Sequence, residues 1–253
     1  MRKSILVLIS FLLLYCGGNS PQPDWTARDF FHAAKEKYDD ESYYEAVNDF
    51  TVVLLRFAGS TVADSAQYYL ADSHYKMGDY LIAGVEFERL VNSYTQSPMV
   101  KKAQYRLAQS FNALSPRSSL DQKYTTKAIR EYQYFIEEFP ADTLKEKAEK
   151  KILTLRNKLG KKEFENAEIY RKMSEFSAAI VYYDQVLSKY YDTDWADDAQ
   201  YGKIRTYLDA EDADQALLET TKFEQQFPQS ELKEDLDELK NDISDLQKEI
   251  AQE

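Results

Sequence analysis

The chain has 253 residues with 44 acidic and 32 basic side chains, and its formal net charge of −12 disfavours nucleic acids and anionic lipid surfaces as main partners. Its single cysteine excludes an intrachain disulfide, and its two histidines, His32 and His74, are too far apart for a local metal motif. We find no candidate catalytic residue, metal site, cofactor site or small-molecule substrate site, so the expected function is not enzymatic.

The first 15 residues have the pattern of a secretory signal peptide. Arg2 and Lys3 precede an apolar run from Ile5 to Tyr15, which is too short to span a membrane. We expect residues 1–15 to be removed from the mature chain, which takes away these two cations and leaves a net charge of −14.

The end of this run resembles the lipobox of bacterial lipoproteins. Leu13 and Cys16 match the box, in which the cysteine is diacylated and becomes the mature N-terminus, whereas Tyr15 departs from it. More than one acyl chain gives a stable membrane anchor. We expect Cys16 to carry the lipid, residues 16–25 to form a lipidated tether, and Gly17 to favour the outer membrane. The alternative is an ordinary secretory signal with an incidental cysteine.

One pattern of aromatic and small residues recurs five times in the rest of the chain. The distance from the second small residue to the last aromatic is 11 in every copy, and three of the copy-to-copy distances are 37. The copies are Phe31/Ala34/Ala46/Phe57, Tyr68/Ala71/Ala83/Tyr94, Tyr105/Ala108/Ala128/Phe139, Phe164/Ala167/Ala179/Tyr190 and Tyr201/Ile204/Ala216/Phe227.

A period near 34 residues is typical of tetratricopeptide repeats, in which each repeat is a pair of helices, A and B. We therefore predict an all-α, tetratricopeptide-like solenoid of five helix pairs over residues 26–228, with the alanines where helix A crosses helix B. The expected units are about 26–58, 62–95, 98–140, 143–191 and 194–228. Solenoids of this kind present surfaces that hold other proteins.

Two segments depart from plain repetition. Residues 144–159 continue the apolar helical spacing, so we expect them to extend the helix that holds Phe164, with Gly160 as a candidate kink. Residues 229–253 are expected to form a C-terminal amphipathic, coiled-coil-like helix. This helix caps the last repeat, docks on a partner or self-associates. Its apolar seam is Leu232, Leu236, Leu239, Ile243, Leu246 and Ile250.

The A helices line the concave side of a tetratricopeptide solenoid, so their inward residues are candidates for holding a peptide. In the first three repeats these residues are mostly aromatic or amide side chains, which suit an extended or helical peptide with aromatic side chains. Lys35 is the only basic residue in the set. The candidates are Phe31, Lys35, Tyr38, Tyr68, Asp72, Tyr75, Tyr105, Gln109 and Asn112.

Longer motifs resemble one family of repeat lipoproteins. They lie within residues 43–50, 66–80 and 114–140, and the third is the most specific because an insertion bearing Asp121 and Gln122 precedes the helix B alanine. Together with the lipobox, they make the mature chain similar to the outer-membrane β-barrel assembly lipoproteins of the BamD (ComL) family.

The resemblance implies a lipid-anchored scaffold on the periplasmic face of the outer membrane. It implies unfolded β-barrel precursors and the periplasmic domains of the BamA assembly pore as partners, with precursors at the N-terminal repeats and BamA at the C-terminal ones. Two alternatives remain. One is another repeat lipoprotein, such as a secretin pilotin or a coordinator of peptidoglycan synthases, and the other is an enzyme built on the solenoid.

Overall fold

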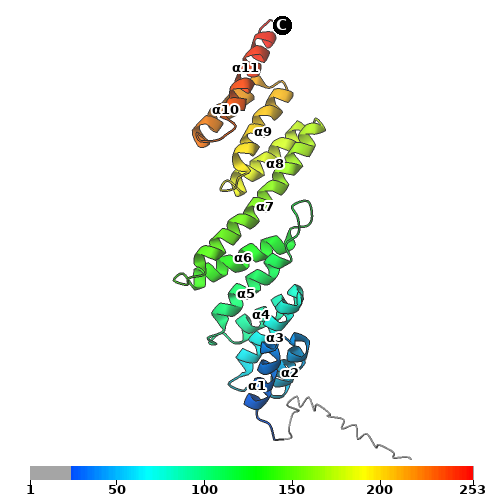
Figure 1. Ribbon diagram of the computed structural model, residues 1–253. Coiled ribbons are helices and arrows are strands. Elements are labelled where there is room, and N and C mark those ends of the chain that lie inside the picture. The colour runs from blue at the N-terminus through cyan, green and yellow to red at the C-terminus, as the bar shows by residue number, and fades with distance from the viewer. Residues whose placement is uncertain (1–23, 253) are drawn as a thin grey trace, which may run out of the picture.

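A computed structural model describes residues 24–252, which form eleven α-helices and no strand (Figure 1). The predicted signal peptide, Cys16 and the predicted tether up to residue 23 lie outside the described residues. No helix between residues 24 and 252 has the length and apolar character needed to cross a membrane. The helices are α1 (Ala27–Asp39), α2 (Tyr43–Arg56), α3 (Ala63–Met77), α4 (Tyr80–Ser93), α5 (Val100–Ala113), α6 (Lys123–Glu138), α7 (Lys145–Lys172), α8 (Phe176–Lys189), α9 (Ala196–Asp209), α10 (Ala213–Gln226) and α11 (Lys233–Ile250).

The helices follow one another along an elongated molecule, with α1 at one end and α11 at the other (Figure 1). Each helix packs chiefly on the helices before and after it in the chain, and a second, weaker set of contacts joins α1 to α3, α3 to α5, α7 to α9 and α9 to α11. Helices 1, 3, 5, 7 and 9 are therefore the A helices of a solenoid. The predicted fold class is confirmed.

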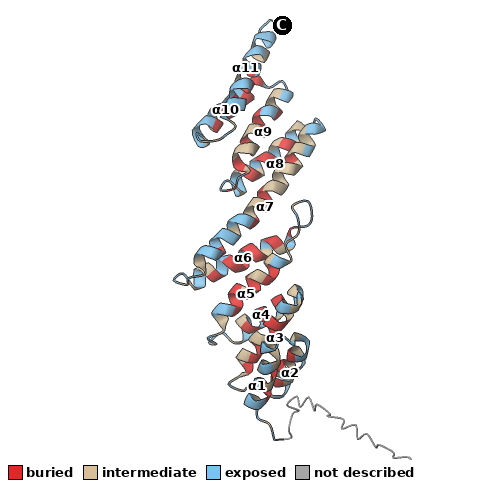
Figure 2. Ribbon diagram, in the orientation of Figure 1, coloured by how far each residue is buried: buried red, intermediate tan, exposed pale blue. Residues whose placement is uncertain are grey.

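The small residues of the repeat lie where paired helices cross. The second alanine of every copy is fully buried, and so is the first alanine in the four copies that have one. Large side chains such as Phe50, Phe87 and Phe223 fill the space beside them and are also fully buried. The buried positions face the neighbouring helix and the exposed ones face outwards along the whole stack (Figure 2).

A buried glutamine–glutamate pair also ties helix A to helix B in three repeats. The side-chain amide of Gln67 donates to the backbone carbonyl and the carboxylate of Glu86, and Gln104 makes the same two bonds to Glu131. Gln200 repeats the arrangement with Glu219. Each glutamine directly precedes the first aromatic of its copy, so the pair is part of the repeat. Buried polar groups need such partners, and sequence reasoning missed these.

The extension ahead of the fourth repeat is one continuous helix, α7, with Gly160 in its interior. Gly160 is where the turn after α8 comes close, because a Cβ at this position would lie 2.9 Å from the Thr193 hydroxyl. The predicted extension is thus present. Gly160 does not interrupt the helix; it allows the turn after α8 to pack closely against α7.

The insertion in the third repeat is an ordered loop between α5 and α6 that lies against α7. The amide of Gln122 donates to the carbonyls of Arg117, Ser118 and Leu120, which organises the loop. Lys162 of α7 donates to the Leu120 carbonyl over 2.8 Å and holds the loop on the solenoid. This is the structural use of the Gln122 motif found in the sequence.

The C-terminal helix α11 packs on α9 and α10 of its own chain. Leu236, Leu239 and Ile243 of the apolar seam are buried there, and Leu232 and Leu246 are partly buried against the same cluster. Ile250, at the end of the helix, remains 52% exposed. This packing favours the capping interpretation for the first part of the seam.

Candidate peptide-binding site

A polar chain crosses the A helices of the first three repeats. Tyr38 of α1 donates a hydrogen bond to Oδ2 of Asp72 on α3. On the other side of this carboxylate, Nε of Arg106 on α5 lies 3.1 Å from Oδ1. The three residues are each 34 positions apart, which is one helical turn less than the 37-residue repeat. Each therefore lies one turn earlier in its helix than the one before, and together they cross the stack diagonally.

Asp72 is buried, with 2% of its surface exposed. Its Oδ1 atom has no hydrogen bond that meets normal geometry, so Arg106 neutralises it by charge at 3.1 Å without an aligned N–H. A buried carboxylate is costly unless it is paired. Asp72 therefore positions the side chains of Tyr38 and Arg106. A ligand on the concave face would contact these two side chains before it reached Asp72.

Tyrosines and an amide surround the exposed side of this chain. The Arg106 guanidinium carbon lies 4.9 Å from the centre of the Tyr75 ring, and Nη1 of Arg106 donates to the Gln109 side-chain oxygen over 3.2 Å. Burial raises the pKa of the Tyr68 and Tyr75 hydroxyls, and the Asp72 charge raises the pKa of Tyr68 further. Both phenols therefore stay protonated at neutral pH and remain hydrogen-bond donors, as suits a surface that exchanges water for a peptide.

Two of the other predicted residues, Phe31 and Tyr105, lie mainly in the core. Phe31 packs against the rings of Phe50 and Tyr69, and Tyr105 is 9% exposed and packs against Tyr132 and Phe135. These two are chiefly packing residues.

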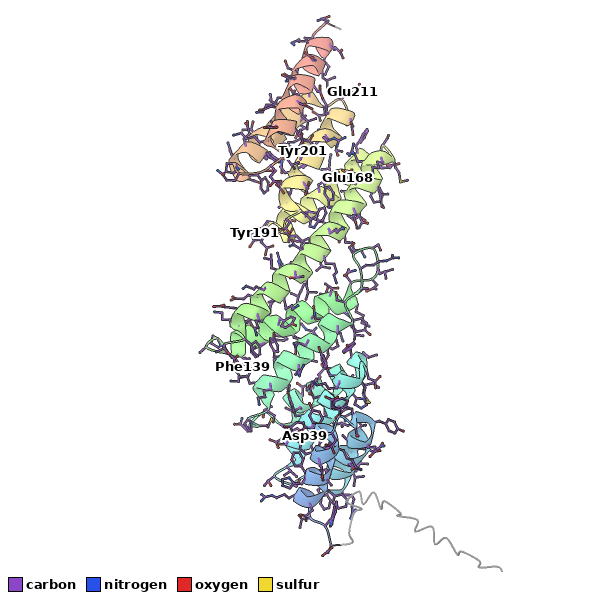
Figure 3. The ribbon with its side chains drawn as sticks, in the orientation of Figure 1. Asp39, Phe139, Glu168, Tyr191, Tyr201 and Glu211 are labelled. Carbon is purple, nitrogen blue, oxygen red and sulfur yellow. The ribbon has the colours of Figure 1, made fainter. Side chains whose placement is uncertain are left out.

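Two half-buried candidates, Lys35 and Asn112, lie on the first and the last of the three A helices. Lys35 lies 4.9 Å above the Tyr69 ring and pairs with Asp39, which Figure 3 labels near the end of α1. Asn112 lies at the C-terminal end of α5. The structure thus gathers Tyr38, Tyr68, Tyr75 and Gln109 around Asp72 and leaves Phe31, Lys35, Tyr105 and Asn112 at the margins.

A groove beside the polar chain contains cations that sequence reasoning missed. Its volume is about 640 Å³, and it lies between α5 and α7. The helical spacing of Lys102, Arg106 and Gln109, and of Lys147, Lys150 and Lys151, was the available signal, because residues three and four apart share a helix face. We call it the lysine groove. It is lined by Tyr68, Lys102, Tyr105, Arg106, Gln109, Leu144, Lys147, Lys150 and Lys151.

A second polar cluster joins the A helices in the C-terminal half. Arg171 of α7 lies 3.1 Å from Glu168 and 2.7 Å from Asp209 of α9, and Tyr183 of α8 donates to Glu168. Glu168, labelled in Figure 3, lies where α7 packs on α8 and α9. Every member has a partner within the chain, so this cluster ties the helices together.

The chain matches the model of the YfiO family of outer membrane lipoproteins over residues 23–208. The chain belongs to this family. It is 23% identical over 204 residues to the outer membrane protein assembly factor BamD of Haemophilus influenzae, and the match covers 76% of this chain and 78% of that protein. Membership identifies the chain as a non-enzymatic outer membrane lipoprotein.

Solved repeat structures are more distant in sequence. A thermophilic TPR protein of Thermus thermophilus is 18% identical, with 87% of this chain and 98% of that chain covered and a TM-score of 0.37. The TPR2AB domain of yeast Sti1 is 14% identical, with 86% and 98% covered and a TM-score of 0.40.

Proposed function

We propose that this YfiO-family protein is a scaffold for the assembly of outer-membrane β-barrels, anchored by lipid on Cys16 and facing the periplasm. It binds unfolded barrel precursors at the first three repeats and docks to the BamA assembly pore through its C-terminal repeats. Family membership and the similarity to an assembly factor support the process. The observation that supports the precursor site is the Tyr38–Asp72–Arg106 chain, which gathers half-buried aromatic and cationic groups from three repeats.

An extended precursor segment fits the chemistry of this surface. Tyr75 and Tyr68 offer ring faces and phenol donors, and Arg106 and Gln109 offer further donors and an acceptor for a peptide backbone. Aromatic and arginine side chains of this kind supply most of the binding energy at interfaces. The partly buried rings keep their positions without the ligand, which lowers the entropy lost on binding.

The decisive test is titration of a labelled peptide from the last strand of a barrel precursor against the full chain. Tyr75→Ala removes the ring on which Arg106 stacks and should weaken binding by about 1 kcal/mol or more, or roughly fivefold. Tyr44→Ala is the matched control, because Tyr44 lies on α2 and is 74% exposed. Unchanged affinity for Tyr75→Ala, with the helical circular dichroism intact, would remove the precursor site from this proposal.

Co-purification from solubilised membranes tests the docking half of the proposal. We expect the full chain to capture the BamA pore. Ile250→Asp, at the exposed end of the α11 seam, should reduce this capture while sparing the fold and the precursor peptide. Capture of a secretin or a peptidoglycan synthase in place of BamA would support another repeat-lipoprotein scaffold and contradict barrel assembly.

A further inference from the structure

The lysine groove is unusual in this acidic protein because four of its five cations lack carboxylate partners. Among the described residues, Arg106 has Asp72 within 4.0 Å, whereas no carboxylate lies that close to Lys102, Lys147, Lys150 or Lys151. Helix α7 as a whole carries ten basic and five acidic side chains in a chain of net charge −12. Five of the nine residues that line the groove are cationic and none is acidic, so positive charge is concentrated there.

Three of these lysines also carry a cost within their own helix. Lys150 and Lys151 lie three and four positions after Lys147, so both share a face of α7 with it and their like charges repel. Lys147 lies in the first turn, where the helix dipole is positive and disfavours a cation. A bound anion would relieve both effects.

The floor of the groove is apolar while its rim is cationic. Tyr68 and Tyr105 of the A helices and Leu144, at the start of α7, contribute ring and aliphatic surface. Lysine ammonium groups on flexible stems act as separate point charges and suit carboxylates spaced along a chain. One terminal carboxylate would leave most of the four unpaired lysines uncompensated, so the charge fits a ligand with several carboxylates.

We propose that the lysine groove is a docking site for an acidic peptide segment of a partner protein, with at least two carboxylates flanking an apolar side chain. The carboxylates lie along the lysines of α5 and α7, and the apolar side chain covers Tyr68, Tyr105 and Leu144. This interaction goes beyond the precursor-binding proposal and does not depend on barrel assembly.

Fluorescence anisotropy with the full-length chain in detergent tests the groove. The labelled ligand is an amide-capped peptide that alternates glutamate with phenylalanine and leucine, and its matched form has glutamine in place of glutamate. We expect the acidic peptide to bind, the glutamine form not to bind, and added salt to weaken the complex because the rim is exposed to solvent.

Two triple variants with the same change in net charge distinguish the contribution of the groove lysines to affinity from that of the overall charge of the protein. Lys147→Gln/Lys150→Gln/Lys151→Gln should weaken binding roughly tenfold, since each exposed ion pair contributes modestly. Lys76→Gln/Lys123→Gln/Lys172→Gln changes three exposed lysines outside the groove and should leave affinity within about twofold. The Lys147/Lys150/Lys151 variant should leave binding of the precursor peptide unchanged, because none of these three lysines belongs to the precursor site, so the two proposals fail separately.

Three results would overturn the proposal. Equal weakening by both triple variants would mean that only overall charge matters. Binding of the glutamine peptide once its C-terminus is a free carboxylate would show a terminal-carboxylate site instead. Displacement of the acidic peptide by millimolar inorganic phosphate, or by vesicles of anionic lipid, would indicate a general anion or lipid site.

Discussion

Single residues hold the helices of this solenoid closer than ordinary side chains would permit. At Gly202 of α9, a Cβ would lie 2.6 Å from two ring atoms of Tyr183 on α8. Tyr183 is itself fully buried, and its hydroxyl donates to Glu168, so the ring has no free space into which to move. The glycine is therefore required for contact between two neighbouring repeats.

Gly202→Ala should consequently destabilise the protein by about 1–3 kcal/mol, because the overpacking outweighs the better helix propensity of alanine. Thermal denaturation followed by circular dichroism measures the effect. Gly59→Ala is the control, since a Cβ there meets no atom within 4 Å. Equal melting temperatures for the two variants would refute this role of Gly202.

The buried Glu219 makes stability depend on pH. Burial alone raises the pKa of its carboxyl, but hydrogen bonds from Lys222 and Gln200 and the charge of Lys203 outweigh burial and hold the pKa below its usual value of 4.5. The folded state then binds fewer protons than the unfolded state, so this stabilisation is present above about pH 4.5 and is lost as the pH falls below it.

Glu219→Gln should cost about 1–3 kcal/mol at pH 7, where the wild-type carboxylate is fully charged. The difference in unfolding free energy between the variant and the wild type should narrow as the pH falls from 6 to 3. Urea denaturation at several pH values measures it, with Glu36→Gln as an exposed control on α1. A gap that stays constant over this range would contradict the assigned charge interaction.

At the scale of elements, α7 and α11 depart from the regular helix pair in different ways. Helix α7 joins the two halves of the solenoid, since its first part packs in the cluster of α3–α6 and its second part packs on α8 and α9. Helix α11 closes the stack, because Leu236, Leu239 and Ile243 cover the end that a sixth repeat would otherwise cover.

Leu236→Asp should open the C-terminal end of the solenoid. Leu236 is 1% exposed, so the change places a charge in an apolar contact and loosens α11 from α9 and α10. Ile250→Asp on the same seam should have little effect, since Ile250 is 52% exposed. Hydrogen exchange with mass spectrometry reports the loss of protection helix by helix.

At the scale of the whole molecule, the contacts are nearly one-dimensional. Within residues 24–252, each helix contacts only helices one or two places away in the chain, so unfolding at one end leaves the other end supported. In the Leu236→Asp variant, α9–α11 should therefore exchange faster while α1–α4 keep their protection. Uniform loss of protection from α1 to α11 would show instead that the solenoid unfolds as one unit.

Membrane attachment is also a property of the whole molecule, and we expect it to depend on Cys16. Cys16→Ala should leave the protein in the soluble fraction or as an uncleaved precursor, because the change removes the residue that we propose carries the acyl chains of the anchor. Fractionation followed by immunoblotting measures this, and inhibition of the lipoprotein signal peptidase should accumulate the precursor of the unaltered chain. Full recovery of the Cys16→Ala protein with membranes would exclude lipid on this residue as the anchor.

The helix pairs and their order could be predicted from the amino-acid pattern along the chain. Local spacing was sufficient, because Ala46 and Ala83 and their equivalents must be small wherever two helices cross, and the constant step of 11 to the next aromatic places that crossing in each repeat. The same local logic predicted the long α7, which needs only continuous helical spacing.

Which polar residues contact one another depends on how the helices pack in three dimensions. Tyr38, Asp72 and Arg106 come from three separate helices, and their meeting depends on the rotation and stagger of each helix in the stack. Lys102 and Lys150 line one groove because α5 and α7 both pack on α6, which sets the distance between them. Spacing along one helix specifies which side chains share a face, whereas the distance between faces of different helices is set by how the core packs them.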